Sequence, residues 1–191
     1  MPRIADRHLQ ERILKVAQSL WRTHGERGLT LRTVAKAAQT TTTTVYKRFR
    51  NKEALSLAIA ERVNKQLVGL VTSATNLEEA IVRYLHFAET HPREYQLLYR
   101  ATWPEIFGKG QPRPGQVWVT EQLANRFGGS PRSYTEVHFA LFLITHGAAS
   151  LLAAAPRNPA TVEARDWCVA ISGALLKNVQ IFTRNGAKRA R

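Results

Sequence analysis

Hydrophobic residues recur every three to four positions along most of the chain, which is the spacing of one buried face of an α-helix. No segment shows the sustained two-residue alternation that is typical of half-buried strands. Prolines and glycines separate the periodic segments. The pattern therefore predicts an all-α protein. Helices are expected over about 7–24, 30–38, 41–49, from 51 onward, 77–91, 93–107, 117–127, 134–155 and 161–183.

The lengths of these segments divide the chain into an N-terminal head and a larger helical body. The second and third segments are about nine residues each, and a turn near Gln39–Thr40 joins them, which is the size of a helix-turn-helix. With the helix before them they form a three-helix head. We assign the head to residues 1–52, the helical body to 53–185 and a basic tail to 186–191.

Charge is unevenly distributed along the chain. The 191 residues carry 28 lysines and arginines against 14 acidic residues, a formal net charge of +14. Residues 1–55 hold 12 of the basic and four of the acidic residues, so this part alone carries +8. Such a balance favours a polyanionic partner, either nucleic acid or an acidic membrane surface. The alternative is a basic surface with no partner of its own.

Cysteine content and hydropathy bear on where the protein works. Cys168 is the one cysteine, so no disulfide forms within the chain, which fits a reducing cytosol. The longest apolar stretch, from Phe139 to Ala155, is interrupted by polar residues and is short for a membrane span. The N-terminus is charged, with no apolar stretch that could serve as a signal peptide. We expect a soluble, cytoplasmic protein with no membrane association.

Residues 41–49 form the candidate recognition helix of the helix-turn-helix. Val45 and Phe49 lie four positions apart and are expected to face the core, which leaves their neighbours for solvent or DNA. A helix of eight or so residues is roughly 12 Å long and suits a major groove about 12 Å wide. Threonines can hydrogen-bond to base edges and offer a methyl group to thymine. The candidate DNA-contacting residues are Arg32, Thr41, Thr42, Thr43, Thr44, Tyr46, Lys47, Arg48 and Lys52.

Individual roles follow from the chemistry of these side chains. Thr41 is expected to cap the recognition helix. Tyr46 would reach a phosphate with its hydroxyl, and Lys47 and Arg48 would contact phosphates or a guanine edge. Lys52 stands at the start of the next helix, where free amide groups and the helix dipole favour an anion such as a phosphate.

Two competing interpretations concern the same segment. Threonine favours strands over helices, so Thr40–Val45 considered alone would be assigned to a strand. The flanking caps and helices argue instead for a helix. A basic helix face is also often only solvated, and Tyr46 would then be a packed aromatic with a wet tip.

The stretch GLTLRTVAKAAQTTTTTVYKRFRNKEAL, Gly28 to Leu55, resembles the DNA-binding head of the tetracycline-repressor (TetR) family. One departure is Gln39, where the family usually has glycine; a left-handed glutamine costs roughly 1 kcal/mol, which would favour a rearranged turn. The resemblance implies a ligand-responsive transcription regulator, a repressor released from a palindromic DNA operator by a small molecule. The matching features are Thr30, Val34-Ala35, Ala38, Thr44-Val45-Tyr46, Phe49, Lys52 and Leu55, and the likeness extends over about residues 8–65.

The same resemblance implies that the body binds an effector among its middle helices and forms a homodimer through its last two long helices. Segments 134–155 and 161–183 are apolar on more than one face, so each needs cover on both sides. The alternative is a fully buried helix within a monomer. A pocket of aromatic residues with a few polar groups would suit a lipophilic or planar molecule, although aromatics at helical spacing are also typical of a core. The candidate pocket residues are Phe87, Trp103, Phe107, Trp118, Leu123, His138, Phe142 and His146.

Other classes of protein fit the sequence less well. An enzyme is disfavoured because the chain has no glycine-rich phosphate loop and no nucleophile motif. His138 and His146 are eight positions apart rather than the four that chelate a metal, so no metal or cofactor is expected. An architectural DNA binder with little sequence preference stays open as a second hypothesis. A membrane-surface binder would need a basic amphipathic helix outside the head, and none stands out.

Overall fold

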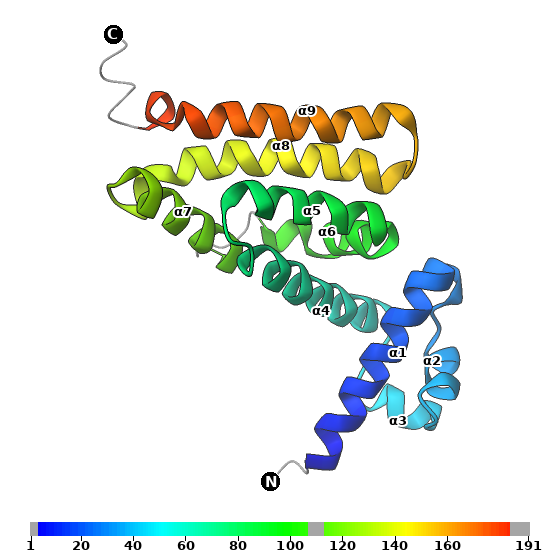
Figure 1. Ribbon diagram of the computed structural model, residues 1–191. Coiled ribbons are helices and arrows are strands. Elements are labelled where there is room, and N and C mark those ends of the chain that lie inside the picture. The colour runs from blue at the N-terminus through cyan, green and yellow to red at the C-terminus, as the bar shows by residue number, and fades with distance from the viewer. Residues whose placement is uncertain (1–3, 107–112, 184–191) are drawn as a thin grey trace. The chain divides into compact units, whose positions relative to one another are not determined.

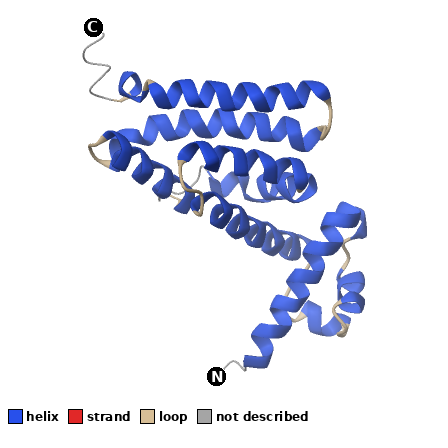
Figure 2. Cartoon of the chain, viewed as in Figure 1, coloured by secondary structure: helices blue, strands red, loops and turns tan. Residues whose placement is uncertain are grey.

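The computed structural model describes residues 4–106 and 113–183, and every regular element within these ranges is a helix (Figure 2). This confirms the predicted all-α class, with a helix-turn-helix head on a larger helical body. The elements, labelled in Figure 1, are α1 (Ile4–Gly28), α2 (Leu31–Ala37), α3 (Thr42–Tyr46), α4 (Lys52–Thr72), α5 (Leu77–Thr90), α6 (Pro92–Ile106), α7 (Pro114–Phe127), η1 (Pro131–Tyr134), α8 (Thr135–Ala154), α9 (Pro159–Lys177) and η2 (Val179–Phe182).

The chain forms two compact units, and α6 belongs to the same unit as the N-terminal helices. Among the described residues, the first, here called the head unit, comprises 4–65 and 93–106. The second, here called the body unit, comprises 66–92 and 113–183. The chain therefore passes from one unit to the other within α4 and again at the start of α6. The functional boundary expected after residue 52 stays a prediction.

Helix α1 supplies the central apolar face of the head unit. Ile13, Ala17 and Trp21 are buried at spacings of four residues, so they lie on one face of the helix. Gly25 has a φ of 66°, so it adopts the left-handed conformation that glycine permits without steric cost. The sequence placed the helix end at this glycine. The structure instead has a kink at Gly25 and further helical turns up to Gly28.

The body unit is built around two long helices that run side by side, α8 and α9, with α5 packed against both of them (Figure 1). Its core includes Leu85 of α5, Leu123 of α7, Leu152 of α8 and Leu176 of α9, all fully buried. Pro131–Ala154 is long and apolar enough to cross a membrane by length and composition alone. The core helix of a soluble protein meets the same criterion, so one such helix among the described residues does not define a membrane span.

Candidate nucleic-acid interface

Helix α2 is fixed at its start by reciprocal hydrogen bonds between Thr30 and Thr33. The Thr30 hydroxyl accepts from the Thr33 backbone N–H at 3.0 Å, and the Thr33 hydroxyl accepts from the Thr30 backbone N–H at 3.0 Å. Two backbone donors that the helix leaves unsatisfied are thereby paired. Thr30 is thus the N-terminal cap of α2. It sets the direction in which α2 enters the core through Leu31, Val34 and Ala35.

The turn between α2 and α3 is closed with Gln39 in the left-handed conformation, at φ 51°. The Thr40 backbone N–H donates to the Ala35 carbonyl at 3.0 Å, and Gln39 N–H donates to the Lys36 carbonyl at 3.2 Å. The glutamine thus takes the conformation that a glycine would adopt more easily. The turn is not rearranged, although glutamine stands where the family usually has glycine. The steric strain of a left-handed residue therefore falls on Gln39.

The threonine run after the turn is helical. The Thr41 hydroxyl accepts from the Thr44 backbone N–H at 3.1 Å, which confirms Thr41 as the cap of α3. The strand interpretation is therefore wrong, because the cap and the turn outweigh the local preference of threonine. The α-helix covers Thr42–Tyr46 and is shorter than the predicted 41–49. One further helical turn follows the assigned helix, since the Phe49 backbone N–H donates to the Val45 carbonyl at 2.9 Å.

The two sides of α3 differ as the sequence predicted. Val45 is fully buried, and Phe49 just after the helix is 5% exposed, so both belong to the core. On the opposite side Thr43 and Lys47 are exposed, and 54% of Tyr46 is accessible to solvent. Tyr46 is therefore not the packed aromatic of the competing interpretation.

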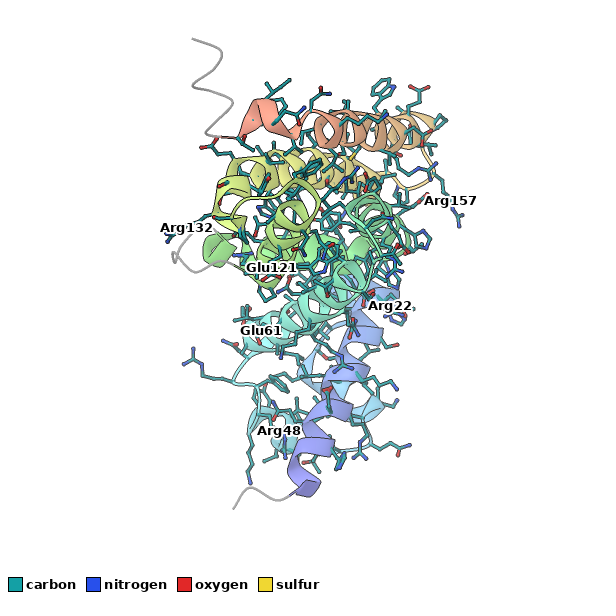
Figure 3. All side chains as sticks on the ribbon, turned by 60° about the vertical axis from the view of Figure 1, so that its left-hand side comes forward. Arg22, Arg48, Glu61, Glu121, Arg132 and Arg157 are labelled. Carbon is teal, nitrogen blue, oxygen red and sulfur yellow. The ribbon has the colours of Figure 1, made fainter. Side chains whose placement is uncertain are left out.

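The remaining candidate DNA-contacting residues differ in exposure and in their hydrogen bonds to the rest of the protein. Thr41 and Arg32 are exposed, whereas Thr42 and Thr44 are half-buried. Arg48, labelled in Figure 3, is half-buried and donates from Nη1 to the Thr44 carbonyl at 3.2 Å. The side chain of Lys52 donates from Nζ to the Glu26 carbonyl at 2.7 Å.

Among the basic residues that the sequence analysis did not single out, three lie close to α2 and α3 in the sequence: Arg27, Lys36 and Arg50. All three are exposed, and none makes an ion pair or a side-chain hydrogen bond within the described part of the chain. Their signal in the sequence was the excess charge of residues 1–55, which points to a surface and not to particular positions. Arg27 lies in the last turn of α1, Lys36 in the last turn of α2, and Arg50 between α3 and α4.

Acidic residues of the head unit are largely neutralised by ion pairs. Glu11 pairs with Arg62, and Glu26 pairs with Arg100 at 2.9 Å. The hydrogen bond and the charge of Arg100 hold the pKa of Glu26 below its usual value, with a smaller contribution from the charge of Lys52. Pairing of this kind leaves the exposed lysines and arginines as the dominant charge of the unit.

In the body unit, three of the candidate pocket residues form an aromatic ladder along α8. Phe142 stacks on His146 with ring centroids 5.4 Å apart, and His138 stacks on Phe142 at 6.4 Å. All three are half-buried. Burial lowers the pKa of His138 to about 4 and lowers that of His146 as well. Both imidazoles are therefore neutral at physiological pH.

The other candidate pocket residues differ in burial and in how far the structure describes them. Phe87 is 7% exposed and stacks on His91 at 4.9 Å. Leu123 is fully buried in the core, and Trp118 is half-buried. Trp103 lies on α6, where its side chain is outside the described set, and Phe107 lies outside the described residues altogether. Within the described residues, no group of three metal-ligating side chains is present.

A capped helix-turn-helix with a basic, solvent-exposed outer face, joined to a larger helical body, defines a DNA-binding transcriptional regulator. Residues 13–59 match the family model for bacterial regulatory proteins of the tetR family. The match covers the helix-turn-helix region, so residues 13–59 form a DNA-binding domain of this family. No curated protein matches the chain.

Solved structures share the fold over nearly the whole chain. A TetR-like transcriptional regulator from Rhodococcus sp. RHA1 has a TM-score of 0.59 at 17% identity, covering 93% of this chain and 98% of that one. A putative transcriptional regulator from Streptomyces coelicolor has a TM-score of 0.52 at 25% identity, with 87% and 97% covered. The TetR family repressor AlkX from Dietzia sp., implicated in biodegradation of n-alkanes, has a TM-score of 0.53 at 18% identity, with 92% and 98% covered.

Proposed function

We propose that the protein is a cytoplasmic repressor that binds a palindromic operator as a homodimer and leaves it when a small lipophilic or planar molecule binds the body. The observation that carries the proposal is the geometry of α3. Its start is fixed by Thr41, its inner side is buried through Val45, and its outer side presents Thr43, Tyr46 and Lys47 to solvent. A rigid, capped helix with short polar side chains outward is suited to a major groove.

Within this proposal the exposed residues of the head divide into base-reading and phosphate-binding groups. Thr43 would face base edges, with the half-buried Thr42 and Thr44 at the margin of the contact. Tyr46 and Lys47 would contact phosphates, which fix the register of the helix but carry no sequence information. The phosphate contacts would be completed by the remaining cations of this surface, which are Arg27, Arg32, Lys36, Arg48, Arg50 and Lys52.

The exposed apolar residues of α8 and α9 support the proposed homodimer. A monomeric soluble protein seldom exposes so many large apolar side chains on neighbouring helices. A second copy packing on the same face would form a four-helix bundle and remove them from water. The residues concerned are Phe139 (47% exposed), Leu143 (51%), Leu151 (53%), Trp167 (63%) and Ile171 (53%).

The ladder on α8 supports an effector that is planar or lipophilic and carries few charges. Phe142 between two neutral imidazoles offers stacking surface together with hydrogen-bonding nitrogens at both ends. A combination of aromatic faces with a few polar atoms is typical of small-molecule sites. AlkX, a structural neighbour, is implicated in the biodegradation of n-alkanes, which are lipophilic.

Release from the operator would follow from coupling between the two sites. An effector that binds more tightly to a conformation with wrongly spaced heads lowers operator affinity by its differential binding free energy. No catalytic step is needed for this activity, so we regard the protein as a regulator and not an enzyme.

A selection from randomised duplex DNA tests the proposal. We expect the full-length protein to recover one pseudo-palindrome with half-sites about one helical turn, or a multiple of it, apart. Affinity for this site should exceed that for a scrambled duplex by about 10³ or more. The Thr43→Val variant should recover a different half-site, whereas the matched change Thr23→Val on α1 should recover the same one. Equal affinity for unrelated sequences would instead support the architectural DNA binder.

A further inference from the structure

A groove between α5 and α9 lies within the body unit. Both helices are labelled in Figure 1, and they contact each other. The groove has a volume of about 460 Å³, which is within the range of small-molecule sites. Its lining residues do not include His138, Phe142 or His146, so it is distinct from the aromatic ladder on α8.

One part of the groove is apolar. It is lined by Val82 and Leu85 of α5 and by Val169 and Ala170 of α9. Leu85 is fully buried, and the other three residues are exposed. An apolar ligand lying in the groove would remove these side chains from water, which is favourable in proportion to the area covered.

The other part of the groove is charged. It is formed by Glu89 of α5 and by Arg165 and Asp166 of α9. Because Arg165 forms an ion pair with Glu89, the charged residues of the two helices lie at the same end of the groove. Leu85 and Val169 are each four positions away from this pair, about one helical turn. A ligand that lies along the groove therefore meets charge at one end and apolar surface beyond it.

Carboxylates outnumber cations at the charged end. Two carboxylates, Glu89 and Asp166, stand against the one guanidinium of Arg165, in a chain whose formal net charge is +14. Arg165 Nε donates to Asp166 Oδ1 at 3.2 Å, whereas Arg165 Nη1 lies 3.7 Å from Glu89 Oε2. The second distance is too long for a hydrogen bond. The guanidinium is therefore bound more closely to Asp166 than to Glu89.

Glu89 is the carboxylate with capacity to spare. Its side chain is 25% exposed, and no donor among the described residues is hydrogen-bonded to it. An ionised carboxylate accepts several hydrogen bonds, and those from a cationic donor are the strongest. A partly buried carboxylate of this kind favours a ligand that brings both positive charge and N–H groups.

The groove and the proposed dimer interface lie on different sides of α9. At about 100° per residue, Trp167 projects about 160–200° away from Arg165 and Val169 around the helix axis. Trp167 belongs to the apolar face assigned to the second copy, whereas Arg165 and Val169 line the groove. A second copy that covers Trp167 therefore leaves the groove accessible.

We infer that the groove between α5 and α9 is a second small-molecule site, which binds a primary or secondary amine with an apolar body. The ammonium group donates to Glu89 and to the neighbouring Asp166, and the apolar body covers Val82 and Val169. Arg165 competes with the ligand for the same carboxylates. The inference goes beyond the proposed function, because binding in this groove does not depend on operator recognition or on the ladder.

Three small molecules with the same alkyl chain test the chemistry of the site: hexylammonium, heptanoate and 1-hexanol. Each is titrated into the full-length protein and followed by the NMR signals of the His86 imidazole, which lines the groove and reports where the ligand binds. Ala170→Phe fills the groove at an exposed position without changing its charge. Glu136→Gln removes an exposed carboxylate of α8 outside the groove and is the control. The variants compared with wild type are Glu89→Gln, Arg165→Gln, Ala170→Phe and Glu136→Gln.

We expect wild type and Glu136→Gln to bind hexylammonium equally, and at least about tenfold more tightly than heptanoate or 1-hexanol. Glu89→Gln should weaken hexylammonium binding by about fivefold or more, and Ala170→Phe should abolish the shift of the His86 signals. Arg165→Gln should strengthen binding by about threefold, because a competing cation is removed. A gain of affinity cannot arise from a damaged fold, so this variant keeps the test decisive even if another is destabilised.

Three results would overturn the inference. The first is tighter binding of heptanoate than of hexylammonium. The second is equal hexylammonium affinity in Glu89→Gln and Glu136→Gln, and the third is weaker binding by Arg165→Gln. A failure of the operator selection would leave these titrations unaffected, so the two proposals are tested separately.

Discussion

Lys52, the first residue of α4, donates a hydrogen bond from its Nζ to the backbone carbonyl of Glu26 at 2.7 Å. The two residues are 26 positions apart, and the contact joins the start of α4 to the end of α1. A cation at the C-terminal end of a helix offsets the partial negative charge of its free carbonyls. Lys52 therefore has a structural role that the sequence analysis, which assigned it to a phosphate, did not foresee. An ammonium has three N–H donors, so Lys52 can donate to the Glu26 carbonyl and to a DNA phosphate at the same time.

Replacing this lysine separates its two roles. Lys52→Met should lower the free energy of unfolding by about 1 kcal/mol, because one hydrogen bond to a charged donor is lost. It should also weaken binding to specific and scrambled duplexes alike and reduce the slope of log affinity against log salt by about 1. Chemical denaturation and salt titrations measure the two effects. Lys65→Met, an exposed lysine of the same helix, is the matched control. An unchanged salt slope would remove Lys52 from the phosphate contacts.

The turn of the helix-turn-helix stores backbone strain at one position. Gln39→Gly should raise the free energy of unfolding by about 1 kcal/mol, because glycine adopts the observed φ of 51° without the steric cost of a Cβ atom. Gln39→Ala keeps the Cβ atom and should change stability little. The urea midpoint at constant slope is the appropriate measurement. If Gln39→Gly leaves the midpoint unchanged or lowers it, the strain is compensated by contacts of the glutamine side chain.

Burial of His138 predicts a loss of stability in mild acid. Burial lowers the pKa of His138 to about 4 in the folded protein, against an ordinary value near 6.5. Above about pH 6.5 the imidazole is neutral in both states. As the pH falls toward 4, the unfolded chain takes up a proton that the folded protein does not, so the free energy of unfolding decreases by on the order of 3 kcal/mol.

Denaturation of wild type and His138→Phe between pH 7.5 and about 4 measures this contribution. The difference between the two proteins should grow as the pH falls, because phenylalanine cannot be protonated. His86→Phe, which replaces an exposed histidine of α5, should follow the wild-type curve. Parallel curves for wild type and His138→Phe would show that His138 titrates as it does in the unfolded chain.

The apolar face of α8 and α9 predicts the effect of a charge placed on it. Trp167→Glu should convert the protein to a monomer, because a carboxylate at a residue that is 63% exposed in one chain would be buried between two. Val82→Glu, at an exposed valine of α5, should leave the oligomeric state unchanged. Sedimentation measures the mass of each variant. If Trp167→Glu is still a folded dimer, the dimer interface does not include this face of α8 and α9.

Sequence patterns predicted those parts of the fold that depend on local chemistry. The Thr41 cap and the burial of Val45 follow from short-range rules, and the structure confirms them. The stacking of Phe142 between His138 and His146 on α8 was not predicted, although all three were named as pocket candidates.

Contacts between distant segments could not be predicted in this way. Nothing in the local pattern near residue 94 indicates that Glu94 pairs with Arg22, 72 positions earlier, or that α6 joins the head unit. The short α3 has a similar origin. The regular helix ends at Tyr46. The apolar spacing of Val45 and Phe49 predicted a longer helix, because the backbone makes one further helical turn up to Phe49.

Directed cleavage from α3 tests most directly whether this helix enters the DNA groove. A Thr43→Cys variant in a Cys168→Ser background would carry an iron chelate that cuts DNA within its reach. Unlabelled protein is the control. We predict two clusters of cuts on the recovered operator, one in each half-site and related by the dimer axis. Cuts spread evenly along the duplex, or absent from a site that the labelled protein still occupies, would contradict the docking of α3 in the groove.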